Sequence, residues 1–192
     1  MAGTIKLDGT TFLTKDNSNN FTLDVGSGGS VPTVGTITSG TIGSNVTFPA
    51  GHVIQTVSQL YTSATTVTST SYSDAGPSLD ITPSSTSNKI FVFFDVDNYF
   101  YKNGTDGRCK AKIVRTIGGS ATDVLEQVST GFFMDGGGSD KNIYTRTTFS
   151  LVDSPNTTSA ATYKLQVRTA GATHVSMHNG TGTTFMLMEI KG

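Results

Sequence analysis

This sequence is poor in cysteine, tryptophan and charge, and each scarcity excludes something. It has one cysteine, no tryptophan, and 13 lysines and arginines against 14 aspartates and glutamates. A lone cysteine cannot form an internal disulfide, and a net charge of −1 argues against capture of nucleic acid or an anionic membrane by bulk electrostatics. Alternation predicts that one local basic stripe is the solvated side of a strand: Arg108, Lys110, Lys112 and Arg115.

Long apolar runs are missing as well. No stretch reaches the roughly 18 apolar residues that a membrane helix needs, and the first residues lack the apolar segment of a signal peptide. Apolar spacing of the helical kind does not persist, so no amphipathic helix is expected. We therefore expect a protein that is made in a cytoplasm and has neither nucleic acid nor membrane as a partner.

Motifs for catalysis or metal binding are also absent. Cys109 lies in an alternating run, where a small core residue is expected rather than a nucleophile. His174 and His178 are four residues apart, and on a strand that spacing is about 13 Å, too long to share a metal. The glycine-rich segment 136–141 lacks the Walker spacing, and no acidic pair suggests a glycan depolymerase. We expect no catalytic residue, no metal and no cofactor, and hence no enzyme.

What the sequence does contain is a strong β signal. Threonine is the commonest residue and glycine occurs 22 times, a composition that suits pleated strands joined by tight turns. From residue 52 onward, period-two alternation recurs in runs of strand length. The expected strands are 53–60, 65–72, 78–82, 89–97, 108–116, 124–128, 143–151, 163–169, 174–177 and 184–190. The pattern predicts an all-β fold, an antiparallel jelly-roll-like β-sandwich.

The first 51 residues differ from the rest. Short extended pieces are separated by turn-forming segments rich in Asp, Asn, Ser and Gly, which leave too little apolar area for a core. We therefore divide the chain into an extended, Gly/Thr-rich arm and neck, 1–51, and a sandwich domain, 52–192. The arm is expected to attach the protein to a larger particle and to gain its shape by pairing with other chains. Its candidate attachment residues are Ile5, Leu7, Phe12, Phe21 and Leu23.

Two expected strands are apolar on both faces. In a sandwich only one face of a strand meets the core, so the second face suggests a subunit interface, although a central strand under a loop would show the same pattern. A patch of this size is too large for a soluble monomer, and a homotrimer is predicted. The candidate interface residues are Phe91, Phe93, Phe185, Met186 and Met188.

A group of aromatic and polar residues precedes an expected turn at Asn103-Gly104. Aromatic rings cover the apolar faces of sugars while carboxylates and amides bind the hydroxyls, so this composition is compatible with glycan contact. Core aromatics beside a solvated turn are the alternative. The candidate contacts are Asp97, Asn98, Tyr99 and Tyr101.

Several segments together resemble a known family. They are FPAGHVIQ at 48–55, TSYSD at 70–74, ITPSSTSNKI at 81–90, and a final strand ending in Met188-Glu189-Ile190. Over roughly 48–192 the chain resembles the terminal globular domain of bacteriophage tail-fibre-like and virion surface proteins. The resemblance implies a trimeric, β-rich domain that is joined by a glycine- and threonine-rich neck to an attachment segment, and it implies no catalytic residues.

The resemblance also suggests where the protein acts. Tail fibres commonly have a long particle-binding domain, whereas only about 50 residues precede the sandwich here. We therefore expect a virion surface protein, a capsid decoration or cement protein or a short head fibre, with itself and other virion proteins, such as the major capsid protein, as partners. The alternative is a tail-fibre-type receptor-binding adhesin that recognises a host surface glycan.

Overall fold

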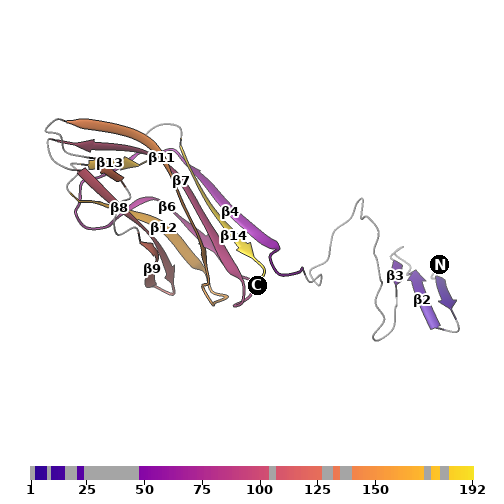
Figure 1. Ribbon diagram of the computed structural model, residues 1–192. Coiled ribbons are helices and arrows are strands. Elements are labelled where there is room, and N and C mark those ends of the chain that lie inside the picture. The colour runs from indigo at the N-terminus through magenta and orange to yellow at the C-terminus, as the bar shows by residue number, and fades with distance from the viewer. Residues whose placement is uncertain are drawn as a thin grey trace. The chain divides into compact units, whose positions relative to one another are not determined.

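The computed structural model describes residues 3–7, 10–15, 21–23, 48–103, 107–126, 132–134, 140–170, 174–177 and 182–192. The chain divides into two compact units, Met1–Val46 and Thr47–Gly192, close to the boundary expected after residue 51. Strands are the regular structure of the described residues (Figure 1). No helix in this part of the chain is long and apolar enough to cross a membrane.

The first unit contains a three-stranded antiparallel sheet in the order β1-β2-β3. Its strands are β1 (Gly3–Leu7), β2 (Thr10–Lys15) and β3 (Phe21–Leu23). The backbone register places Ile5 opposite Leu13, and Leu13 opposite Leu23. These strands were expected to pair with other chains, but in the structure they pair with one another. Only Asp8 and Gly9 separate β1 from β2, and such a short separation favours a hairpin.

The second unit contains two antiparallel sheets. The five-stranded sheet, called the smaller sheet below, consists of β10 (Phe132–Met134), β8 (Gly107–Ile117), β12 (Ala161–Thr169) and β6 (Ser73–Ile81) in that order, with β9 (Ser120–Glu126) paired to β8. The six-stranded larger sheet has the order β4 (Val53–Tyr61), β14 (Thr183–Ile190), β7 (Lys89–Lys102), β13 (His174–Met177) and β5 (Thr65–Val67), with β11 (Lys141–Asp153) paired to β7. The all-β class and the antiparallel sheets are confirmed, whereas the jelly-roll connectivity stays a prediction.

The core lies between these two sheets and follows from strand alternation. On β12, Tyr163, Leu165 and Val167 are buried while the residues between them are partly exposed. On β7 the buried set includes Ile90, Val92, Phe94 and Val96. Each buried large apolar side chain contributes about 1.5 to 3 kcal/mol relative to its exposure. Figure 1 shows β7, β14 and β4 running together in one layer.

An ion pair joins the two sheets at one end of the core. Arg115 of β8 donates to both carboxylate oxygens of Asp153 of β11, at 2.8 and 2.7 Å. The hydroxyl of Tyr163 on β12 donates to the same carboxylate at 2.6 Å. Burial, and then the hydrogen bond to Asp153, raise the pKa of Tyr163. The placement of Arg115 in the solvated basic stripe was wrong, because it alternates in step with inward-facing Ile113.

Candidate interaction face of the larger sheet

The side of the larger sheet that faces away from the core is the candidate functional site, and we call it the outer face. Its residues are those of β7, β14, β11 and β4 that alternate with the buried ones. The register aligns them in rows across the sheet. One row is Val152, Phe91, Met188 and Thr56, and the next is Ser150, Phe93, Met186 and Ser58. These two rows form the apolar half of the outer face.

The apolar half is open to solvent in the single chain. Val152 is 55% exposed, and Phe91, Phe93, Met186 and Met188 are each partly exposed. The rings of Phe91 and Phe93 are 6.4 Å apart, so they form a continuous aromatic surface along β7. Four of the five residues predicted for a subunit interface therefore share one face, and Val152 lies beside them without having been predicted.

Phe185, the fifth predicted interface residue, belongs to the core instead. It is fully buried opposite Phe94, and the two ring centroids are 4.2 Å apart. On β14, Phe185 and Leu187 point inward, so Met186 and Met188 point outward. The prediction grouped both faces of an apolar strand, and only one of them can lie on the surface.

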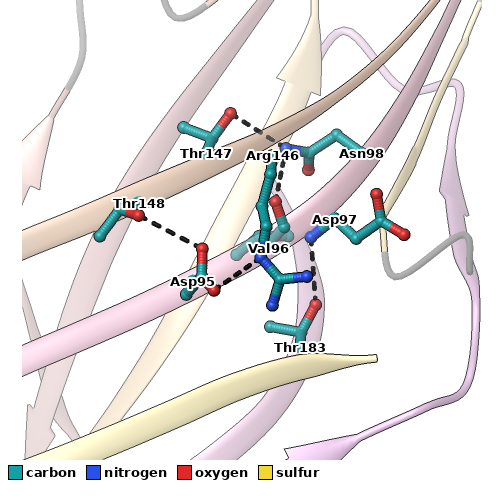
Figure 2. Close-up of polar contacts among 8 residues, drawn as sticks. All are labelled: Asp95, Val96, Asp97, Asn98, Arg146, Thr147, Thr148 and Thr183. Atoms are coloured by element: carbon teal, nitrogen blue, oxygen red, sulfur yellow. Dashed lines mark hydrogen bonds and ion pairs between the residues drawn. The ribbon is translucent and has the colours of Figure 1, made fainter. Parts of the chain in front are cut away.

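Charged residues occupy the middle of the outer face. Arg146 on β11 pairs with the carboxylate of Asp95 on β7 at 2.7 Å, and Thr148 donates to the other oxygen of Asp95 at 3.3 Å. Asp97 lies opposite Arg146 in the register, but Figure 2 shows its carboxylate directed away from the Asp95–Arg146 pair. Among the described residues, none donates a hydrogen bond to that carboxylate. The backbone amide of Asp97 donates to Thr183 Oγ1 at 3.3 Å.

Three tyrosines lie beyond the charged residues on the same face. The rings of Tyr99 on β7 and Tyr144 on β11 are 4.8 Å apart and inclined at 37°. Tyr99 donates to the Asn142 side-chain oxygen at 3.1 Å, and Tyr101 donates to an Asp140 carboxylate oxygen at 3.1 Å. That hydrogen bond, more than burial, raises the pKa of Tyr101. We call this set the tyrosine cluster: Tyr99, Tyr101, Asp140, Asn142 and Tyr144.

The four candidate glycan contacts do not lie on one face of β7, and Asn98 was wrongly included among them. Asp97, Tyr99 and Tyr101 share the outer face, whereas Asn98 is fully buried on the other side of β7. Its amide nitrogen donates to the Val96 carbonyl at 3.0 Å and to Thr147 Oγ1 at 3.1 Å, as Figure 2 shows. Sequence reasoning missed Tyr144 and Asn142, because only the pairing of β11 with β7 places them beside Tyr99.

The residues considered for other chemistry lie elsewhere. Cys109 is 1% exposed, and burial raises the pKa of its thiol to about 12, which disfavours the reactive thiolate. Among the described side chains, no three from His, Cys, Asp and Glu are grouped so as to hold a metal ion. His178 and the glycines at 136–138 lie outside the described residues. The arm residues are all on β1, β2 and β3, where the structure describes the backbone.

Comparison with known proteins gives no assignment. No protein-family model matches this chain, and a search of curated proteins found no match. A functional proposal therefore depends on the resemblance of the sequence segments and on the geometry of the outer face.

Proposed function

We propose that this protein is a non-enzymatic structural protein of a bacteriophage particle. In this proposal it is a homotrimeric capsid decoration or cement protein, or a short head fibre, held on the particle by its N-terminal unit. The observation that carries the proposal is the apolar half of the outer face, which needs a covering partner. The resemblance of residues 48–192 to virion surface domains supports the same assignment.

A second copy of this chain is the partner that the apolar half fits best. The eight residues of its two rows are all uncharged, so bringing copies together on these rows opposes no like charges. Large aromatic and methionine side chains are also enriched in the buried centres of subunit interfaces. Exposure of Leu60 (65%) and Val53 (50%) on neighbouring β4 extends the apolar area toward the sheet edge. The number three comes from the family resemblance.

The N-terminal unit is proposed as the attachment element. In the order β1-β2-β3, the two outer strands each have one side without a partner among the described strands. Unpaired strand edges can accept a further strand, and strand addition is a common way for proteins to bind one another. The major capsid protein, or another protein of the particle, would supply that strand.

Light scattering on the purified protein tests the assembly. We expect a mass near three times the 20.1 kDa of the chain. The double variant Met186→Ser and Met188→Ser should lower the mass to that of one chain while the circular dichroism spectrum stays unchanged. Ile143→Ser, at an apolar residue that is 40% exposed but lies on the side of β11 opposite to the outer face, should keep the larger mass. A wild-type mass near that of one chain would contradict the proposal.

Antibody labelling of intact particles tests the attachment. A phage that encodes only residues 47–192 should yield particles without label, while the shortened protein remains a folded assembly in the lysate. Single substitutions in the tyrosine cluster of the full chain serve as the control and should leave the label in place. Labelled particles carrying the shortened protein would show that attachment uses another surface.

A further inference from the structure

We propose that the tyrosine cluster is a binding site for a neutral glycan, with the ring of Tyr144 as its platform. The site is separate from the apolar half of the outer face, because the Asp95–Arg146 pair and Asp97 lie between them along β7 and β11. The inference is therefore independent of the proposed assembly, and either could hold without the other.

The ring of Tyr144 has the properties that a sugar platform needs. It is 69% exposed, the largest exposed fraction among the large apolar and aromatic side chains whose exposure the structure describes. The ring of Tyr99 packs against it, with 4.8 Å between the two ring centroids, and this contact supports the Tyr144 ring on one side. Tyrosine has few rotatable bonds, so holding it against a ligand costs little conformational entropy. A flat, supported and exposed ring is suited to stacking against the apolar face of a pyranose.

Polar groups around the ring can bind hydroxyls. The Tyr99 hydroxyl donates to the Asn142 oxygen, which orients that amide, and the amide nitrogen donates to none of the described residues. Asp140 accepts from Tyr101, and a carboxylate can accept further hydrogen bonds. Sugar hydroxyls both donate and accept, so an amide donor and a carboxylate acceptor beside one ring match them.

The charges at this end of the sheet favour a neutral ligand. Asp97 and Asp140 would repel a sialylated or otherwise acidic glycan, and the guanidinium of Arg146 is paired with Asp95. Lys141 follows Asp140 directly, but its register partner is Lys102, whose side chain is on the core side of β7. Lys141 therefore lies on the side of β11 that is opposite to the outer face.

A glycan array probed with the purified full chain tests the site, with neutral and sialylated oligosaccharides printed side by side. The chain has six tyrosines and no tryptophan, so tyrosine fluorescence can then measure the affinity for a bound neutral oligosaccharide. We expect Tyr144→Ala to weaken binding about tenfold or more, since loss of an aromatic contact is worth a change of that order. Tyr144→Phe should retain most of the affinity because it keeps the ring. Tyr72→Ala is the matched control and should bind as the wild type does, because Tyr72 directly precedes β6 and its ring lies against Lys112 of the smaller sheet.

Four results would overturn the inference. One is a wild-type protein that binds no neutral glycan on the array, and another is a Tyr144→Ala variant with unchanged affinity. The third is a fall in the light-scattering mass of Tyr144→Ala, which would assign the ring to a subunit contact. Preference for sialylated over neutral sugars would likewise contradict the neutral ligand class. A failure of the assembly proposal would be seen instead in the light-scattering mass of the double variant Met186→Ser and Met188→Ser. The glycan binding of that variant should be normal.

Discussion

Glu189 on the last strand accepts a 2.6 Å hydrogen bond from the side-chain amide of Asn88, which lies 101 residues earlier in the chain. Gln55 donates to the other carboxylate oxygen at 2.6 Å. The backbone amide of Ser84 and its hydroxyl donate at 2.6 and 2.8 Å. Among the described residues no cation pairs with this fully buried carboxylate. Neutral donors from β4 and from the connection between β6 and β7 thus fasten β14 to the rest of the sandwich.

We expect Glu189→Gln to lower the free energy of unfolding by about 2 to 3 kcal/mol. The substitution replaces one accepting oxygen by an NH₂ group, which would face donors and leave at least one of them without a partner. Urea denaturation monitored by circular dichroism measures the change. Glu126→Gln, at an exposed glutamate, should alter stability by less than about 0.5 kcal/mol. Equal effects of the two variants would show that the hydrogen bonds of Glu189 add no stability.

The same carboxylate should make the fold sensitive to acid. Burial alone raises the pKa of Glu189, but the hydrogen bonds from Asn88, Gln55 and Ser84 outweigh it and hold the pKa below 4.5. The unfolded chain therefore binds a proton more readily than the folded one, so this stabilisation is present above about pH 4.5 and is lost as the pH falls through the folded value. Unfolding free energies measured between about pH 6 and 3 should decline less in Glu189→Gln than in the wild type. A decline of the same size in both would assign the acid sensitivity to other groups.

Cys109 should be protected from thiol reagents in the folded protein. Its pKa is raised from 9.0 to about 12, which reduces the thiolate fraction near pH 8 by about a thousandfold. Reaction with a disulfide reagent should therefore be slow in native buffer and fast in denaturant, when followed by the absorbance of the released thiol. Cys109→Ser should give no signal in either condition. Rapid labelling of the native protein would mean that β8 opens readily.

Lys102 should reduce stability rather than support it. The side chain is fully buried, and among the described residues its Nζ has no hydrogen-bond partner. Burying an ammonium without a partner costs free energy, so Lys102→Met is expected to raise the free energy of unfolding by at least about 1 kcal/mol. Lys110→Met, on the outward side of β8, is the control and should change it by less than about 0.5 kcal/mol. A loss of stability in Lys102→Met would indicate that the ammonium has a partner in the folded protein.

Local pattern predicted most of the strands well. The expected strands 163–169 and 184–190 lie within β12 and β14, because alternation is a property of the backbone that can be read from a single segment. The segment 65–72 was less successful, since β5 ends at Val67. The expected strand at 78–82 began after Pro77, whereas β6 includes that proline. β6 is the last strand in the order of its sheet, and a strand in that position can accommodate a residue without an N–H. The position of a strand depends on the whole sheet and cannot be read from one segment.

The sequence by itself determined that this protein is all-β and which side chains alternate along each strand, because both follow from propensity and from backbone geometry that repeats every two residues. It did not determine which face of an apolar strand turns inward, so Phe185 and Met186 were predicted together although one is in the core and the other on the outer face. Nor did the sequence predict that the rings of Tyr144 and Tyr99 would be in contact. That contact depends on the register of two strands in a sheet, and register is chosen by the packing of the whole core. A shift of one residue would turn Phe149, the buried side chain of β11, toward solvent.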